Sequence, residues 1–95
     1  MNSQIVDNVD LLQDYDELKK NNISEPILYS HEKAAIIGLR AEQLTRGAKL
    51  HIPVPKDTDN VLVFAERELD ARKTPLILMR TNPSRVDYWK VEDLE

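Results

Sequence analysis

Two segments of the chain carry apolar residues at the spacing of an amphipathic helix. The first helix is predicted from about His31 to Arg46, and the second from about Asp59 to Lys73. In both segments the apolar residues recur every three or four positions and so share one face. These residues are Ala34, Ile37, Ala41 and Leu44 in the first segment, and Val61, Leu62, Ala65 and Leu69 in the second. Two helices with one apolar stripe each are therefore expected.

The first helix carries a second, mixed stripe beside its apolar one, formed by Ile36, Arg40 and Gln43. A helix with two such stripes is expected to pack against two partners, and not to face one partner on one side and water on the other. Ser30 suits the position before the first helical residue, where a hydroxyl can accept a backbone N–H bond. Gly47 suits the left-handed position that follows many helices. The helix thus has a start signal, a stop signal and two faces to cover.

The second half of the chain predicts a second helix followed by a β-hairpin. Asp57 or Thr58 is the expected cap of the second helix, and Pro75 excludes helix beyond it. "PLILMRT" (75–81) is continuously apolar up to its arginine and predicts a short strand, and "NPSR" has turn chemistry. "VDYWKV" (86–91) alternates as a half-buried strand does. One face carries Val86, Tyr88 and Lys90, and the other carries Asp87, Trp89 and Val91.

The negative charge of the chain is concentrated in residues 1–25. This stretch contains six acids and two lysines, whereas the remaining 70 residues contain 11 of each sign. Leu11, Tyr15 and Leu18 lie at helical spacing, and Pro26 interrupts the pattern. We therefore predict an acidic extension over 1–25 that is dispensable for the fold, followed by an α+β domain over 26–95. The alternative is a stable helix in the extension, packed on that domain.

Composition excludes several classes of protein. The chain of 95 residues contains no cysteine, so disulfides, thiolate zinc sites and cysteine nucleophiles are ruled out. A chain of this size without such staples often completes its core against a partner. No basic and apolar leader precedes the first helix, and no apolar run approaches the roughly 20 residues of a membrane span. An intracellular protein without a membrane segment is expected, and its net charge of −4 argues against direct DNA binding.

No pattern of residues indicates catalysis, a metal or a cofactor. With only Gly38 and Gly47, the chain has no glycine-rich phosphate loop. His31 and His51 lie on different elements, without carboxylates at metal-ligand spacing, so surface or capping roles are favoured. The carboxylates of the second helix, among them Glu68, resemble a solvated face. A non-catalytic protein is the prediction.

The order of these features resembles one family. "EKAAIIGLRAEQL" (32–44) is similar to the first-helix signature of the small RNA polymerase subunits that comprise bacterial omega, archaeal subunit K and the sixth shared subunit of the eukaryotic polymerases. "AERELDARKTPLILMR" (65–80) and "DYWKVEDL" (87–94) resemble the family's second helix and closing strand. Tyr29 and His31 depart from the usual threonine and aromatic residue. The resemblance covers residues 29–94.

The resemblance implies a non-catalytic subunit that binds the largest polymerase subunit and helps it assemble and stay assembled. It assigns Gly38, Arg40, Gln43 and Arg80 to the interface with that subunit. Gly38 would then admit a neighbouring backbone. Arg40 and Gln43 would supply directional donors to carbonyls or carboxylates, either across the interface or within the domain, and the same two roles are open for Arg80. The internal alternatives are that Gly38 admits the hairpin and that Arg40 pairs with Glu68. Trp89 is assigned to the core.

The resemblance also implies partners and a place in the cell. The partners are the largest subunit and the rest of the polymerase core, with a transcription factor at the acidic extension and DNA reached only through the complex. A cellular eukaryotic member belongs in the nucleus, and a viral member in the host cytoplasm or virion. The alternative function is a free-standing adaptor that docks partners through its acidic extension. A DNA-binding regulator is disfavoured, because neither helix carries a basic face.

Overall fold

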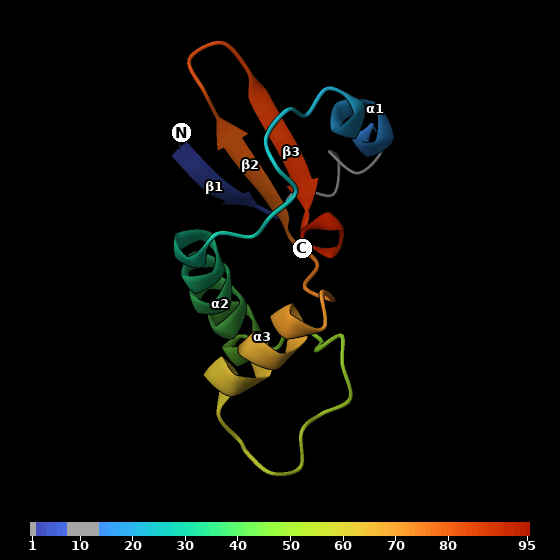
Figure 1. Ribbon diagram of the computed structural model, residues 1–95. Coiled ribbons are helices and arrows are strands. Elements are labelled where there is room, and N and C mark those ends of the chain that lie inside the picture. Colours follow the sequence, from blue (N-terminus) through green and yellow to red (C-terminus); the bar gives the residue numbers. More distant parts are fainter. Residues whose placement is uncertain (1, 8–13) are drawn as a thin grey trace. The chain divides into compact units, whose positions relative to one another are not determined.

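The computed structural model of the chain describes residues 2–7 and 14–95, and it consists of two compact units. One unit, here called the sheet unit, comprises residues 1–27 and 75–95. The other, the helical unit, comprises residues 28–74. Figure 1 shows a three-stranded antiparallel sheet in the former and two main helices in the latter. The predicted α+β class is thus confirmed.

Helix α2 (Ser30–Thr45) begins the helical unit and starts one residue before the predicted position. Its N-cap is Tyr29, whose backbone is extended. The carboxylate of Glu32 accepts the Tyr29 N–H at 3.2 Å, so a side chain three residues into the helix satisfies the backbone ahead of it. Ser30 is therefore the first helical residue and not the predicted cap.

The end of α2 confirms the role predicted for Gly47. This glycine has a φ of +102°, a backbone conformation that side chains rarely adopt. The Gly47 N–H donates to the Leu44 carbonyl at 3.1 Å, and the Ala48 N–H donates to the Gln43 carbonyl at 3.0 Å. Together these bonds form a Schellman motif, which satisfies carbonyls that the last turn would otherwise leave unpaired.

Helix α3 (Val61–Asp70) is shorter at both ends than predicted. Its N-cap is Asn60, whose side chain accepts the Leu62 N–H at 2.9 Å, so the caps predicted at Asp57 or Thr58 are wrong. A second Schellman motif ends the helix, with Arg72 at a φ of +56° in place of a glycine. The termination thus comes from this left-handed turn, several residues before Pro75.

The two helices pack against each other, but the mixed stripe of α2 is the better buried one. Ile36 and Arg40 are buried, whereas Ala34 of the apolar stripe is exposed and Ile37 is only half-buried. Ala41 of the apolar stripe is buried as well, so both stripes contribute to the packing. Arg40 can be buried because its charge has a partner, Glu68, which lies 28 positions further along the chain.

The sheet unit is built from strands β1 (Asn2–Val6), β2 (Ile77–Thr81) and β3 (Val86–Lys90), in that spatial order and all antiparallel. β2 and β3 form the predicted hairpin, with Leu78 opposite Trp89. β1 was not predicted. It pairs with the free edge of β2, with Gln4 opposite Met79.

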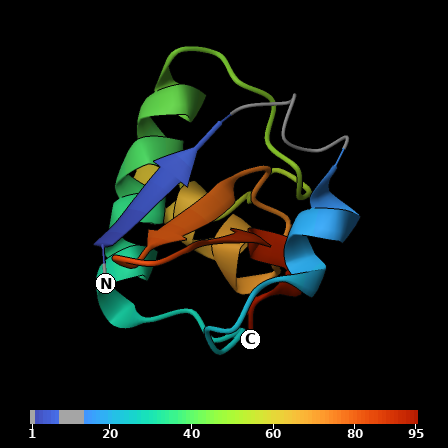
Figure 2. The same ribbon diagram turned by 90° about the horizontal axis from the view of Figure 1, so that it is seen from above.

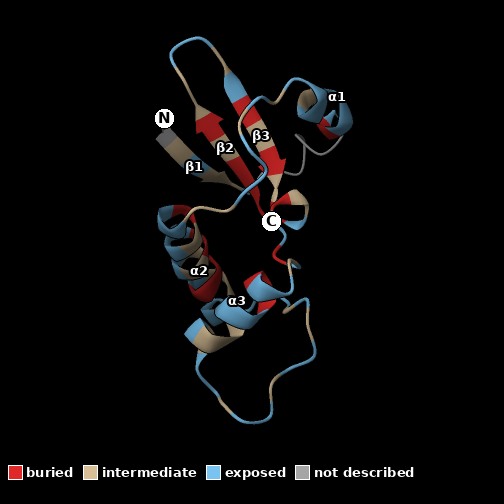
Figure 3. Ribbon diagram, viewed as in Figure 1, coloured by how far each residue is buried: buried red, intermediate tan, exposed pale blue. Residues whose placement is uncertain are grey.

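Burial alternates along β3 as predicted, and Figure 3 shows the alternation. Asp87, Trp89 and the following Val91 are buried, whereas Tyr88 is half-buried. Val91 begins the short 3-10 helix η2 (Val91–Asp93), which closes the hairpin. Trp89 is 7% exposed, which confirms its assignment to the core. The presence of a buried carboxylate in the same row as Trp89 is the unexpected feature.

Helix α1 (Tyr15–Lys20) lies beside β3, at the opposite edge of the sheet from β1, as Figures 1 and 2 both show. Tyr15 is buried; its hydroxyl donates to the Asp93 carboxylate and accepts the Lys90 N–H. Burial and the Asp93 carboxylate raise the pKa of Tyr15, so it stays a neutral donor. Lys19 adds an ion pair to Asp93 at 3.3 Å.

These contacts argue against the expectation that residues 1–25 are dispensable for the fold, which deletion of the segment would test. The side-chain amide of Asn22 both donates to the Tyr88 carbonyl and accepts the Tyr88 N–H, as a neighbouring strand would. α1 and the segment after it thus cover the outer edge of β3. The alternative of a helix packed on the domain agrees with α1, although Leu11 and Leu12 lie outside the described residues. The domain boundary between residues 25 and 26 stays a prediction.

Candidate functional site

The helical unit is organised around a buried ion pair between α2 and α3. Arg40 is 3% exposed and Glu68 is 0% exposed. The Arg40 Nε donates to one carboxylate oxygen of Glu68 at 2.6 Å, and its Nη2 donates to the other at 3.1 Å. This two-pronged geometry is the strong form of an arginine–carboxylate contact. The internal alternative for Arg40 is confirmed, and the expectation that Glu68 belongs to a solvated face is wrong.

The same ion pair fixes the segment that follows α2. The Arg40 Nη2 donates to the Lys49 carbonyl at 2.7 Å, and the His51 N–H donates to Glu68 at 2.9 Å. Gln43 takes part through its side-chain oxygen, which accepts from the Arg40 Nη1 at 3.1 Å. A charged pair that would be costly to bury alone is thus stabilised by further hydrogen bonds, and it holds non-helical backbone against both helices.

Gly38 lies on the exposed side of α2. A Cβ built on it would meet no atom within 4 Å, so no packing inside the helical unit requires a glycine there. A glycine in a helix interior costs about 1 kcal/mol relative to alanine. The positions one turn before it, Ala34 and Ala35, are also exposed, so this side of α2 is both small and accessible.

Arg80 lies on β2 of the sheet unit and is 0% exposed. Its guanidinium donates to the carbonyls of Glu25 and Ile27 and to the hydroxyl of Ser24. Arg80 therefore holds residues 24–27 against the sheet, in the same way that Arg40 holds the segment after α2. Arg40 and Arg80, the two arginines that were assigned to the interface, lie in different units. Each donates hydrogen bonds to residues of its own unit.

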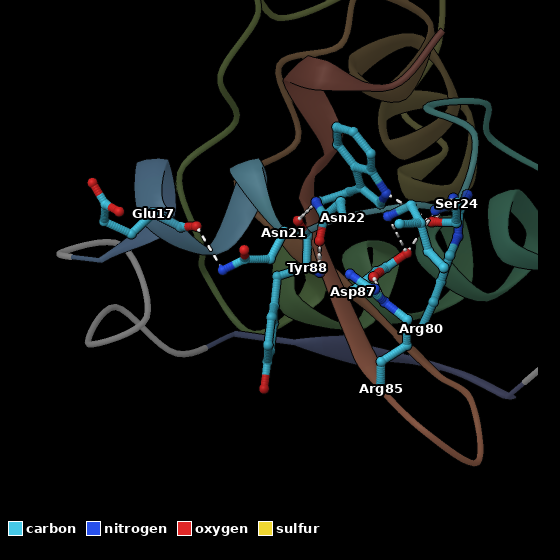
Figure 4. A network of polar contacts seen from close by, with 10 residues as sticks. Glu17, Asn21, Asn22, Ser24, Arg80, Arg85, Asp87 and Tyr88 are labelled. Atoms are coloured by element: carbon cyan, nitrogen blue, oxygen red, sulfur yellow. Dashed lines mark hydrogen bonds and ion pairs between the residues drawn. The ribbon is translucent and has the colours of Figure 1, made fainter.

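Asp87 and Ser24 form a site that the sequence did not reveal (Figure 4). Asp87 is 0% exposed on β3, and its carboxylate accepts the N–H groups of Ser24 at 2.7 Å and Ile23 at 3.2 Å. The hydroxyl of Ser24 accepts from Arg80 and from the indole N–H of Trp89 at 3.0 Å. Alternation places Asp87 on the same strand face as Trp89, but the backbone N–H groups that bind its carboxylate lie more than sixty positions away and are not marked by any local signal in the sequence.

Hydrogen bonds decide the ionisation of Asp87. Burial on its own would raise its pKa, but bonds from the Ser24 hydroxyl, the N–H groups of Ser24 and Ile23, and Arg85 outweigh that effect. The pKa of Asp87 is therefore held below its ordinary value of 3.8. The folded protein favours the carboxylate, which is the form that these donors stabilise.

This pKa shift predicts a loss of stability in acid. A group whose pKa is lowered by folding stabilises the fold above its ordinary pKa and loses that contribution as the pH falls through the folded value. We expect the sheet unit to weaken below about pH 4. Asp87→Asn should remove part of this dependence and lower the unfolding free energy at pH 7 by about 1–3 kcal/mol. Urea titrations followed by Trp89 fluorescence between pH 2 and 7 test this; equal pH slopes in both proteins would contradict it.

Within residues 2–7 and 14–95, no group of three or more histidine, aspartate or glutamate side chains is placed to hold a metal ion. None of the helices in that part of the chain is long and apolar enough to span a membrane.

Comparison with known proteins links these features to one family. The chain is 38% identical over 61 residues to DNA-directed RNA polymerase subunit Rpo6 of Thermofilum pendens, a match that covers 64% of this chain and 75% of that subunit. It is 31% identical over 77 residues to subunit RPABC2 of RNA polymerases I, II and III of Saccharomyces cerevisiae, covering 80% and 49% of the two chains. Subunit 6B of RNA polymerases II and V of Arabidopsis thaliana matches at 30% identity over 93 residues, covering 92% and 64%. No family model matches the chain.

The lengths of these relatives differ. The chain spans three quarters of the archaeal subunit but about half of the yeast subunit. The resemblance seen in the helix and hairpin motifs is confirmed by these matches. Because it covers most of the archaeal relative at 38% identity, the chain belongs to the family of small RNA polymerase subunits that contains archaeal Rpo6 and eukaryotic RPABC2.

Proposed function

We propose that this chain is a non-catalytic subunit of a multisubunit DNA-directed RNA polymerase, which binds the largest subunit and promotes its assembly and stability. The observation that carries the proposal is the match to Rpo6 over 75% of that subunit's length. Relatives from a nematode and a yeast, also named as RNA polymerase subunits, support it. The chain reaches DNA only through the complex, and in a eukaryotic cell it acts in the nucleus.

The exposed side of α2 is the proposed contact surface for the largest subunit. Gly38 and its neighbours Ala34 and Ala35 are exposed, and the space above Gly38 is open to 4 Å. A surface without long side chains lets the backbone of another chain approach closely. This use accounts for a helix-interior glycine that nothing within the helical unit explains.

Arg40, Gln43 and Arg80 act indirectly in this proposal. Both arginines are almost fully buried with their donors turned inward, so they position surface segments and do not reach across to a partner. Arg40 and Gln43 hold the segment after α2, and Arg80 holds residues 24–27. The exposed acids of α1, Asp16 and Glu17, offer a surface for a transcription factor in the assembled polymerase.

Purification through an affinity tag on this chain tests the function. We expect the two large polymerase subunits to co-purify in equal amounts with the tagged chain, and the complex to elute from a sizing column as a very large assembly. Recovery of the tagged chain without either large subunit would refute the proposal. Recovery with unrelated proteins instead would favour the free-standing adaptor.

Gly38→Ala separates an interface role from an internal one. In the free chain the substitution should raise the unfolding free energy by about 0.5–1 kcal/mol, because alanine is the better helix former and nothing obstructs its methyl group. In the cell the same variant should compete poorly with the wild-type chain for incorporation into the polymerase. Thermal melting and co-expression of two differently tagged chains measure the two effects. A variant that is both more stable and equally incorporated would show that no partner lies close to Gly38.

A further inference from the structure

The segment that joins the two helices of the helical unit differs in charge from the rest of the chain. Residues 46–56, here called the connector, contain Arg46, Lys49, Lys56 and His51 but no aspartate or glutamate, in a chain whose net charge is −4. Arg46 pairs with Glu42 of α2 at 2.7 Å. The two lysines are exposed, and among the described residues no carboxylate lies within ion-pair distance of either one. The connector thus presents two lysines whose charge no other described residue pairs with.

Both ends of the connector are fixed to the helices. At its start, the Lys49 carbonyl and the His51 N–H bind the buried pair of Arg40 and Glu68, at 2.7 and 2.9 Å. Directly after its last residue, the carboxylate of Asp57 accepts two hydrogen bonds from the guanidinium of Arg67, at 2.7 and 2.8 Å. Residues 52–56 are therefore a bridge between two anchors rather than a loose loop.

The bridge is stiff and partly apolar. Pro53 and Pro55 fix two backbone φ angles, which lowers the entropy that a partner would have to remove on binding. Val54 lies between them and is 66% exposed, although valine is among the residues most often buried. A shallow hollow of about 480 Å³, lined by Lys49, Leu50, His51, Ile52 and Pro53, lies beside it.

We propose that the connector is a docking surface for an acidic segment of a neighbouring polymerase subunit, one that also carries apolar side chains. Lys49 and Lys56 meet its carboxylates, and Val54 together with the hollow receives its apolar groups. This surface is separate from the exposed side of α2 around Gly38. The inference rests on the proposed function, because it takes the partner to be a chain of the same assembly.

An acidic protein segment fits better than nucleic acid. A phosphate backbone is bound by many lysines and arginines and is repelled by net negative charge. Of the connector's arginine and lysines, only Lys49 and Lys56 lack an ion pair with another described residue. The connector has no phenylalanine, tyrosine or tryptophan on which a base could stack. The exposed Val54 makes no favourable contact with a phosphate, whereas its burial against apolar side chains of a protein segment would stabilise the complex.

A charge-swap variant tests the electrostatic part. Lys49→Glu with Lys56→Glu changes side chains only, so the backbone anchors and the melting temperature of the free chain should be kept. The matched control is Lys20→Glu with Lys73→Glu, which makes the same change in net charge at two exposed lysines outside the connector. In tagged purifications at low salt, we expect about five- to tenfold less polymerase with the connector variant than with the control. The difference should shrink as the salt concentration rises.

A photo-crosslinking amino acid in place of Val54 identifies the chain segment that contacts the connector in the assembled polymerase. The control position is Glu66, an exposed residue on α3. In the assembled polymerase, we expect position 54 to crosslink to a segment of another subunit that is rich in aspartate and glutamate. Crosslinks to nucleic acid, to a neutral or basic segment, or at no higher yield than from position 66 would overturn the inference.

The outcomes separate the two proposals. If the wild-type chain recovers no polymerase, the proposed function fails and this inference fails with it. If the wild-type chain recovers polymerase and the connector variant recovers as much as its control, the connector proposal alone is refuted. Selective loss in the connector variant, together with acidic crosslinks from position 54, establishes it.

Discussion

Replacing Arg40 with glutamate is expected to lower the unfolding free energy of the helical unit by about 3–5 kcal/mol, the usual cost of breaking a buried ion pair. Glu68, which is fully buried, would lose two hydrogen bonds and face a second carboxylate. The Lys49 carbonyl would lose its donor as well. Chemical denaturation followed by far-UV circular dichroism, which reports mainly on α2 and α3, measures the loss.

Two control variants show whether the burial of the Arg40–Glu68 pair causes this loss of stability. Arg46→Glu reverses an exposed pair with Glu42 on the same helix, and it should cost no more than about 1 kcal/mol. Arg40→Met combined with Glu68→Leu removes both charges and should recover much of the stability, although the His51 N–H loses its acceptor. Equal losses in Arg40→Glu and Arg46→Glu would show that the buried pair has no special role.

Deleting residues 1–25 should unfold the sheet unit. The deletion removes β1, Tyr15, Asn22 and Ser24 together, and it leaves Arg80 and Asp87 buried without several of their partners. Uncompensated buried charges cost about 3–5 kcal/mol, a large part of the 5–15 kcal/mol that holds a typical domain. Fluorescence of Trp89, the only tryptophan, reports on this unit.

A shorter deletion is the matched control. Removing residues 1–13 takes away β1 but keeps Tyr15 and the Asn22–Ser24 segment, so the edge of β3 stays covered. We expect a moderate loss of stability there and a much larger one when the deletion extends to residue 25. If the longer deletion kept the unfolding midpoint of the full chain, the contacts of residues 15–24 would be irrelevant to stability.

Where the ends of an element depend on neighbouring residues, local signals in the sequence were sufficient to predict that element. Gly47 marked the end of α2 because the left-handed turn there needs no distant contact. The hairpin followed from alternation and from the turn around Asn82, whose N–H donates to the Arg85 carbonyl at 2.9 Å. The pairing of Arg40 with Glu68 was also foreseen as one alternative, since an arginine beside apolar residues needs a partner.

The features that the sequence did not predict all depend on residues far apart along the chain. β1 has a short and weakly patterned sequence, and its pairing partner lies about 75 positions away in β2. Alternation placed Asp87 on the same face as Trp89, but it could not identify the distant N–H groups of Ile23 and Ser24 that stabilise its buried carboxylate. Helical spacing identified two stripes on α2 but could not show which one is better buried. The burial of Arg40 depends on its ion pair with Glu68, a residue of α3.

The order in which the chain is synthesised has a consequence for how the two units form. The helical unit is one continuous stretch, residues 28–74, whereas the sheet unit joins residues 1–27 to residues 75–95. Contacts close in sequence form fastest, and pairing across a long intervening segment waits for loop closure. On the ribosome, α2 and α3 can pack before β2 exists, while β1 and Tyr15 have no sheet to join. We therefore expect the helical unit to fold during translation, and the sheet unit to fold only after the C-terminal hairpin is released.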